Sequence, residues 1–183
     1  MKKIGVIINP NAKKFRTNRS SINDYLQFKA ENVFINSPQN INELKKIIKL
    51  YKKLNSDYIC IAGGDGTIHL VVSELISAYK PAFVPPVLIL KEGTMDNIAK
   101  SVHLKGRGPA LLKRLIKKVS DDKLISHEGR YTIKINDRYC FLFGTGFITN
   151  FLNKAYSGKE KGFIRNIQVA LMTVKEALVN QHN

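Results

Sequence analysis

A glycine-rich segment at residues 63–67, with the sequence Gly-Gly-Asp-Gly-Thr, has the residue types that point most directly to chemistry. Glycines let a backbone turn tightly and approach phosphate oxygens, and the free N–H groups of a following helix attract anions. Thr67 can cap that helix or bond a phosphate. A structural tight turn uses similar residues. A strand is predicted before the segment and a helix after it, which favours a nucleotide phosphate-binding loop at the carboxyl end of a parallel strand.

Asp65 narrows the chemistry that this loop would perform. A carboxylate in a phosphate cradle repels its ligand unless it has another task. It could bind Mg²⁺ or accept a proton from an attacking hydroxyl group, and both tasks belong to phosphoryl transfer. Asp65 is therefore the expected catalytic residue, with a purely structural helix cap as the alternative. The sequence does not identify further metal ligands.

Two other loops are expected beside the first. Gly93 and Thr94 follow another apolar run and precede a helical segment. Asn9 and Pro10 end the first apolar run with a turn signal. Gly-Thr before a helix is ordinary capping chemistry when taken alone. If all these loops follow strands of one parallel sheet, they share a rim and would line a single crevice.

The elements that must position these loops follow from the hydrophobic pattern. Short apolar runs predict strands at residues 3–8, 33–35, 58–62 and 87–90. Amphipathic spacing predicts helices at residues 41–54 and 68–79, with a weaker pattern at 22–28. Strands that alternate with helices predict an α/β fold, with a parallel sheet and helices on both faces.

The pattern changes after residue 122. Residues 131–135 and 138–143 flank Asn136 and Asp137 and predict a β-hairpin, and residues 163–178 predict a last amphipathic helix. One hairpin and one helix make little core on their own. We therefore predict an α/β nucleotide-binding domain at residues 1–122. Residues 123–183 would begin an incomplete β-rich second domain.

The composition leaves several partners open. The net charge of +16 over 183 residues suits nucleic acid, an anionic membrane surface or phosphorylated small molecules. No nucleic-acid-binding motif is present, so nucleic acid is not expected. Cys60 and Cys140 are expected to be buried free thiols, since no Cys/His spacing suits zinc. We find no signal peptide and no bilayer-crossing run, and we expect a cytoplasmic protein, with peripheral membrane contact left open.

The order of the motifs closely resembles the catalytic domain of the diacylglycerol kinase and lipid kinase family. Asn9-Pro10 comes first, then the Gly-Gly-Asp-Gly-Thr loop, then Gly93-Thr94-x-Asp-Asn-x-Ala99. The segments at 139–147 and 159–163 also resemble the family, so the likeness extends over nearly the whole chain. NAD kinases and 6-phosphofructokinases are similar at the first glycine loop alone. The later Gly-Thr segment favours the lipid-kinase branch.

The resemblance implies an NAD kinase/lipid kinase-like α/β domain followed by a β-sandwich, with ATP in the cleft between them. It implies that Mg²⁺ assists transfer of the γ-phosphate to a lipid hydroxyl group, with the lipid at an anionic membrane surface. The oligomeric state stays open, a homodimer included. The expected nucleotide-binding residues are Asn9, Pro10, Asn11, Ser37, Gly63, Gly64, Asp65, Gly66, Thr67, His69, Gly93, Thr94 and Asn97.

The sequence departs from the family pattern at several places. His69-Leu70 stands where the family has Asn-Glu, Lys91 replaces a proline, and Asp96-Asn97 reverses an Asn-Asp pair. The chain also stops early in the second domain. We therefore expect either a fragment of a longer protein or a short member with weak or no kinase activity. The alternative function is a non-catalytic nucleotide-binding or regulatory domain on the same fold, with a nucleic-acid binder less favoured.

Overall fold

Four parallel strands form the central sheet of the part of the chain that the computed structural model describes, residues 1–93 and 96–141. The sheet order is β2-β1-β3-β4. All five residues of β1 are buried, and parallel sheets covered on both faces require such continuous apolar runs. The predicted parallel sheet is therefore confirmed. The strands are β1 (Ile4–Ile8), β2 (Val33–Asn36), β3 (Tyr58–Gly63) and β4 (Val87–Lys91).

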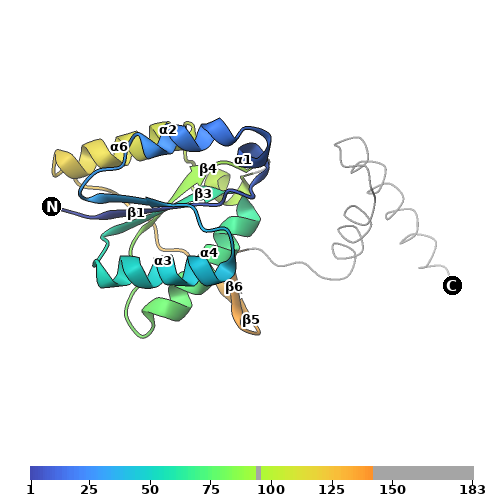
Figure 1. Cartoon of the computed structure of the whole chain (residues 1–183). Coiled ribbons are helices and arrows are strands. Elements are labelled where there is room, and N and C mark those ends of the chain that lie inside the picture. Colours follow the sequence, from blue (N-terminus) through green and yellow to red (C-terminus); the bar gives the residue numbers. More distant parts are fainter. Residues whose placement is uncertain (94–95, 142–183) are drawn as a thin grey trace. The chain divides into compact units, whose positions relative to one another are not determined.

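Helices cover both faces of the sheet, as predicted (Figure 1). Each face has its own buried cluster, because alternate residues of a strand point to opposite faces. One face is covered by α3 (Ile41–Lys53), α4 (Asp65–Tyr79) and the short α5 (Asn97–Ser101). The other is covered by α1 (Lys13–Thr17), the 3-10 helix η1 (Arg19–Ile22), α2 (Asn23–Leu26) and α6 (Gly108–Ser120).

The start of α3 is fixed by a reciprocal cap. The side-chain oxygen of Asn40 accepts a hydrogen bond from the Glu43 N–H group at 3.0 Å, and the Glu43 carboxylate accepts one from the Gln39 N–H group at 2.8 Å. Leu44 and Tyr51 on the inner side of the helix are buried. One side of α3 therefore packs against the sheet, and its other side faces outward.

Two α-helices of the structure, α1 and α6, are missing from the predicted elements. α6 packs Leu111, Leu112, Leu115 and Val119 into the core at helical spacing, but its first turn contains Gly108 and Pro109, which are typical of loops. α1 has five residues and buries only Phe15, so it has too little length for a periodic pattern. Both helices belong to the α/β layer and leave its class unchanged.

A small antiparallel sheet follows the α/β layers. It consists of β5 (Ile133–Ile135) and β6 (Arg138–Cys140), with Asn136 at a φ of 52° in the turn between them. The Tyr139 N–H group donates to the Ser73 hydroxyl on α4 at 2.8 Å, and the hairpin belongs to the same compact unit as the sheet, Met1–Phe141. The predicted hairpin is confirmed. The helix predicted at 163–178 lies outside the described residues, and a domain boundary at residues 122–123 stays a prediction.

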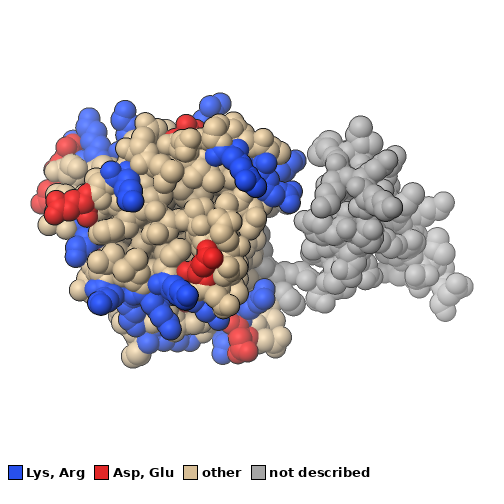
Figure 2. Space-filling view, viewed as in Figure 1, with Lys and Arg blue, Asp and Glu red and all other residues tan. Residues whose placement is uncertain are grey.

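Positive charge is spread over the surface of the unit. Figure 2 shows lysine and arginine side chains in several groups on the visible face, with fewer acidic residues between them. Of the helices described, none combines the length and the apolar character that crossing a membrane requires.

Candidate phosphate-binding site

The loops predicted to act together do meet at one edge of the sheet. Asn9 follows β1, Gly63 ends β3 and Gly93 follows β4, and these strands are neighbours in the sheet. The Asn9 N–H group donates to the Ala62 carbonyl at 2.9 Å, and Gly63 pairs with Lys91 in the strand register. Because parallel strands place their carboxyl ends together, this edge is where an open α/β sheet binds its ligand.

Asn9 ties its own loop to the first glycine loop. Its side-chain Nδ2 donates to the Thr67 Oγ1 at 2.7 Å, while its Oδ1 accepts the Asn11 N–H group at 2.9 Å. The turn over Pro10 closes through a hydrogen bond from the Ala12 N–H group to the Asn9 carbonyl at 3.1 Å. The Thr67 hydroxyl accepts the bond from Asn9 and keeps its own proton for another partner.

Glycine is required where the two glycine loops touch. A Cβ atom at Gly93 would lie 2.7 Å from the Gly64 Cα, so the two loops are in backbone-to-backbone contact. A Cβ atom at Gly63 would lie 2.6 Å from the Thr67 side chain. A side chain at Gly93 would push the two loops apart, and one at Gly63 would displace Thr67. The sequence predicted two neighbouring loops but not this contact.

Gly66 differs from the other glycines because open space lies beside it. No atom would lie within 4 Å of a Cβ atom at this position, and Gly66 is exposed. In α4 the Ile68 N–H group donates to the Gly64 carbonyl at 3.1 Å. The N–H groups of residues 65–67 therefore precede the first helical hydrogen bond, and such groups are free to bind an anion.

Asp65 joins the first glycine loop to the helix of the second. Its Oδ2 accepts the Asn97 N–H group at 3.1 Å and its Oδ1 accepts the Ile98 N–H group at 3.3 Å. The carboxylate is half-buried. The structural alternative weighed from the sequence, a capping aspartate, thus has a geometric basis, although the capped helix is α5 and not α4. A cap of this kind leaves further lone pairs on both oxygens.

The second loop also closes on itself. Asp96 has a φ of 49°, in the left-handed region, and its Oδ1 accepts the Gly93 N–H group at 2.8 Å. Asp96 was not among the predicted site residues, although aspartate is one of the residues that tolerate the left-handed conformation of a turn. Thr94 lies outside the described residues, so its predicted nucleotide contact stays a prediction.

A buried carboxylate, that of Glu92, lies directly before Gly93 and fixes the start of the same loop. Glu92 is 2% exposed, accepts a hydrogen bond from the Tyr25 hydroxyl and pairs with Lys14. A Cβ atom at Gly108 would lie 2.5 Å from the Glu92 Oε1, so the start of α6 also closes over this cluster. The sequence did not indicate this anchor, because its members come from four distant segments.

His69 and Ser37 have polar atoms without partners among residues 1–93 and 96–141. The His69 Nε2 is buried and unbonded there, and its ring lies 6.1 Å from the Phe141 ring, between centroids. Burial lowers the pKa of His69 below its ordinary value, against the opposing charge of Asp65. The imidazole is therefore neutral at physiological pH. The Ser37 Oγ is also buried and unbonded among the described residues.

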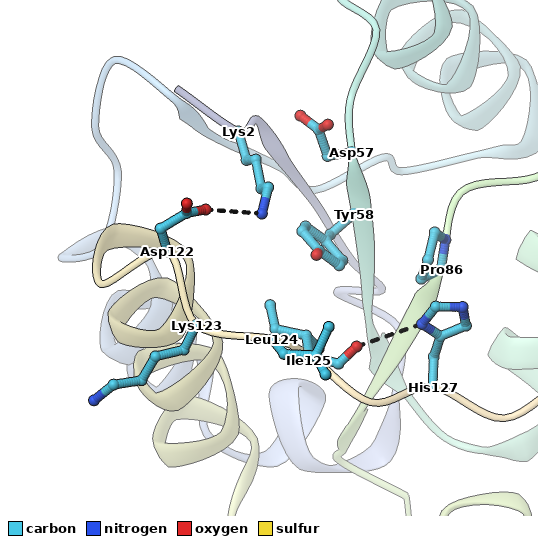
Figure 3. A pocket seen from close by; sticks show the side chains of 9 residues that line it. All are labelled: Lys2, Asp57, Tyr58, Pro86, Asp122, Lys123, Leu124, Ile125 and His127. Atoms are coloured by element: carbon cyan, nitrogen blue, oxygen red, sulfur yellow. Dashed lines mark hydrogen bonds and ion pairs between the residues drawn. The ribbon is translucent and has the colours of Figure 1, made fainter.

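Two pockets among the described residues are candidates for the ligand site. A pocket of about 210 Å³ lies at the carboxyl edge of the sheet and is lined by Asn9, Asn11, Thr67 and Leu70, among others. A larger one, of about 380 Å³, lies at the opposite edge (Figure 3), and none of the predicted nucleotide-binding residues lines it. Its Lys2 is paired with Asp122 at 3.2 Å. The smaller pocket and the loops beside it are the candidate ligand site, because among the described residues the free N–H groups at the start of α4 lie at that edge.

The carboxylates at this edge do not form a closed metal site. Within the part of the chain that the structure describes, no three His, Cys, Asp or Glu side chains come together to hold a metal ion. Mg²⁺ usually keeps several waters and is bound by one or two carboxylates together with substrate phosphates. Asp65 at the phosphate loop suits that mode of binding and not an all-protein cage.

The sequence matches the family described as "Diacylglycerol kinase catalytic domain" over residues 3–124. The chain therefore belongs to the diacylglycerol kinase catalytic domain family, as the motif order predicted. The family is one of phosphotransferases that act on lipids. No curated protein matches the sequence.

Solved structures from Bacillus anthracis str. Sterne match part of the chain. One is a diacylglycerol kinase with 22% sequence identity and a TM-score of 0.49; the match covers 64% of this chain and 40% of that one. Another, of a protein assigned as a diacylglycerol kinase, has 22% identity and a TM-score of 0.47, over 64% of this chain and 42% of that one. The chain thus spans about two fifths of the length of these proteins.

Proposed function

We propose that this chain is the nucleotide-binding part of an ATP-dependent lipid kinase of the diacylglycerol kinase type. The reaction would transfer the γ-phosphoryl group of ATP to a lipid hydroxyl group, leaving ADP and a phosphorylated lipid. Membership of the family supports phosphoryl transfer. The observation that carries the proposal is the meeting of three loops at one sheet edge, where Gly64 and Gly93 touch and Asp65 bridges them.

The ATP phosphates would rest against the start of α4. The N–H groups of residues 65–67 precede the first helical hydrogen bond, and the helix dipole favours negative charge there. The open space beside Gly66 gives a phosphate room to approach the backbone. Asn9 holds Thr67 in place and turns its hydroxyl proton toward a second acceptor. Gly93, Thr94 and Asn97 would complete the site from the opposite loop.

Asp65 would act on the acceptor hydroxyl group or on the metal ion. Proton acceptance in the transition state contributes about 10²–10⁴-fold to a rate. As a metal ligand, the same carboxylate would hold Mg²⁺ together with the ATP phosphates. When bound, the ion supplies positive charge that neutralises the phosphates during transfer. The bonds from Asn97 and Ile98 fix the carboxylate at the loop for either task.

A lipid acceptor implies work at a membrane surface. We therefore propose peripheral contact with an anionic membrane from the cytoplasm. A homodimer stays a prediction, which sedimentation of the purified chain would test.

A second candidate function is a non-catalytic nucleotide-binding domain. It is favoured by Leu70, which lines the pocket beside Asn9 and Thr67 and has an apolar side chain where the family carries a polar one. An apolar group there can shape a binding pocket but cannot exchange protons or bind a metal ion.

Transfer of labelled γ-phosphate from ATP to extracted lipids separates the candidates. A kinase gives labelled lipid, and Asp65→Asn removes most of the label. Stabilisation of the chain by ATP in a melting assay, without any labelled lipid, selects the non-catalytic domain. The absence of both stabilisation and label would contradict both functions.

A further inference from the structure

The outer side of α3 presents three lysines and a leucine as one exposed stripe. We call Lys46, Lys49, Leu50 and Lys53 the α3 face; their spacing of three, four and seven residues puts them on one side of the helix. The lysines are exposed, and Leu50 is 44% exposed. Packing on the sheet uses the opposite side of the helix, so the α3 face has no part in the core.

The charges of the α3 face are not neutralised within residues 1–93 and 96–141. None of its three lysines forms an ion pair there. Other lysines of the helix are engaged, since Lys45 lies 4.0 Å from the Glu74 carboxylate. The helix contains one acidic residue, Glu43, which is used in its cap. Figure 2 shows basic side chains gathered over the position that α3 occupies in Figure 1.

An exposed aromatic side chain lies in a loop that leaves the same layer. Phe83 is 97% exposed and follows the end of α4. The ends of α3 and α4 are joined by Lys52, whose Nζ donates to the Ala78 carbonyl at 2.6 Å and lies 5.6 Å from the centre of the Tyr79 ring. The loop after α4 emerges at this end of the layer (Figure 1).

We propose that the α3 face docks on an anionic phospholipid membrane, with Leu50 and Phe83 entering the headgroup layer. Lysines near an anionic bilayer are attracted by its surface potential, and exposed apolar side chains gain from the interface. A nucleic acid would also attract the lysines, but it offers no apolar layer for Leu50 and Phe83. The inference rests on the proposed function, since a lipid acceptor lies in a membrane, and it adds the surface that makes the contact.

The outer side of α6 provides a matched control. Lys113, Lys117 and Lys118 are exposed lysines on a helix of the opposite layer, so changing them removes the same charge. No exposed large apolar side chain lies on α6. Net charge alone therefore predicts equal effects of the two sets, whereas the proposal predicts an effect of the α3 set only.

The experiment measures co-sedimentation of the full chain with vesicles of equimolar phosphatidylcholine and phosphatidylglycerol, without ATP. The Lys46→Gln, Lys49→Gln, Lys53→Gln triple variant should bind on the order of 100-fold more weakly, at about fivefold for each lysine. The corresponding triple variant at Lys113, Lys117 and Lys118 should bind the vesicles with an affinity within about fivefold of the unchanged chain. This factor is the contribution expected of a single lysine. Circular dichroism confirms that both variants fold.

A second pair of variants tests the apolar contribution. Leu50→Ser with Phe83→Ser should weaken vesicle binding by about tenfold, since the gain from burying apolar area is lost. Leu124→Ser, at another exposed leucine, should have no effect. Binding to phosphatidylcholine vesicles alone should be undetectable.

Several results would overturn the proposal. These are equal losses in the two triple variants, no loss in either, no binding of the unchanged chain to the anionic vesicles, or binding to duplex DNA that depends on α3 without vesicle binding. Because no ATP is present, the result is independent of kinase activity. A chain that binds vesicles through α3 but transfers no phosphate keeps this inference and fails the proposed reaction.

Discussion

Replacing Gly66 by alanine separates ligand binding from folding more cleanly than any other change at the site. The position is the second residue of α4, is exposed, and has no atom within 4 Å of an added Cβ. Alanine is favoured over glycine within a helix by about 0.4–1 kcal/mol. In a protein of this size 1 kcal/mol corresponds to about 2–4 °C, so the melting temperature should rise by about 1–4 °C.

The same methyl group would stand where we place the ATP phosphates. A phosphate oxygen that accepts a hydrogen bond from a backbone N–H group lies about 2.9 Å from the nitrogen. At that distance the phosphate would contact the added Cβ atom. We expect Gly66→Ala to bind Mg²⁺-ATP at least tenfold more weakly, a loss of about 1.4 kcal/mol. Isothermal calorimetry measures the affinity, and melting with and without ATP reports the stabilisation lost.

Gly129→Ala is the matched control for Gly66→Ala. Gly129 also has no atom within 4 Å of an added Cβ, but it lies far along the chain from the phosphate loop. Its alanine variant should bind ATP as the unchanged chain does. If Gly66→Ala bound ATP with unchanged affinity, the phosphates would not lie at the start of α4 and the reasoning would be refuted.

Three further predictions concern the neighbours of this loop. Asp65→Asn should lower phosphoryl transfer by about 10²–10⁴-fold. The chain should stay folded with a somewhat lower melting temperature, because the single amide oxygen keeps one of the two bonds from α5; equal activity would argue for a capping role only. Gly93→Ala should lower the free energy of unfolding by about 1–3 kcal/mol, because its methyl group meets the Gly64 Cα. Urea unfolding measures this loss, and an unchanged midpoint would contradict the contact between the loops. The pKa of His69 is lower in the folded chain than in the unfolded chain, so the unfolded chain binds a proton first as the pH drops. The free energy of unfolding should therefore fall below about pH 6.5, the ordinary pKa of histidine. Melting curves of His69→Gln should lose that part of the pH dependence, and an identical pH profile would show that another group titrates.

Much of the fold could be predicted from local pattern. Residues 58–62 and 87–90 are short continuous apolar runs, which are typical of strands in a parallel sheet covered by helices on both faces. The helical spacing of the apolar residues along α4 predicted which side of the helix faces the core. Topology then placed the loops, because parallel strands end at one edge. α6 was missed because its start contains the loop-forming Gly108 and Pro109, and α1 was missed because its five residues are too few to show a period.

The details of the site depend on contacts between distant segments. The sequence indicated that Gly64 and Gly93 would be neighbours, but not that their backbones touch. The bonds from α5 to Asp65 join residues more than thirty positions apart. The Glu92 anchor combines side chains whose pairing has no local signature. Such contacts arise from tertiary packing, so neither spacing nor propensity reveals them.

Amide chemical shifts of the isotopically labelled chain, titrated with Mg²⁺-ATP, test the central claim most directly. The account predicts saturable shifts that are largest at Gly64, Gly66 and Thr67, with smaller shifts at Asn9 and Asn97. Shifts confined to residues of the larger pocket, such as His127, or no shifts at saturating ATP, would contradict it.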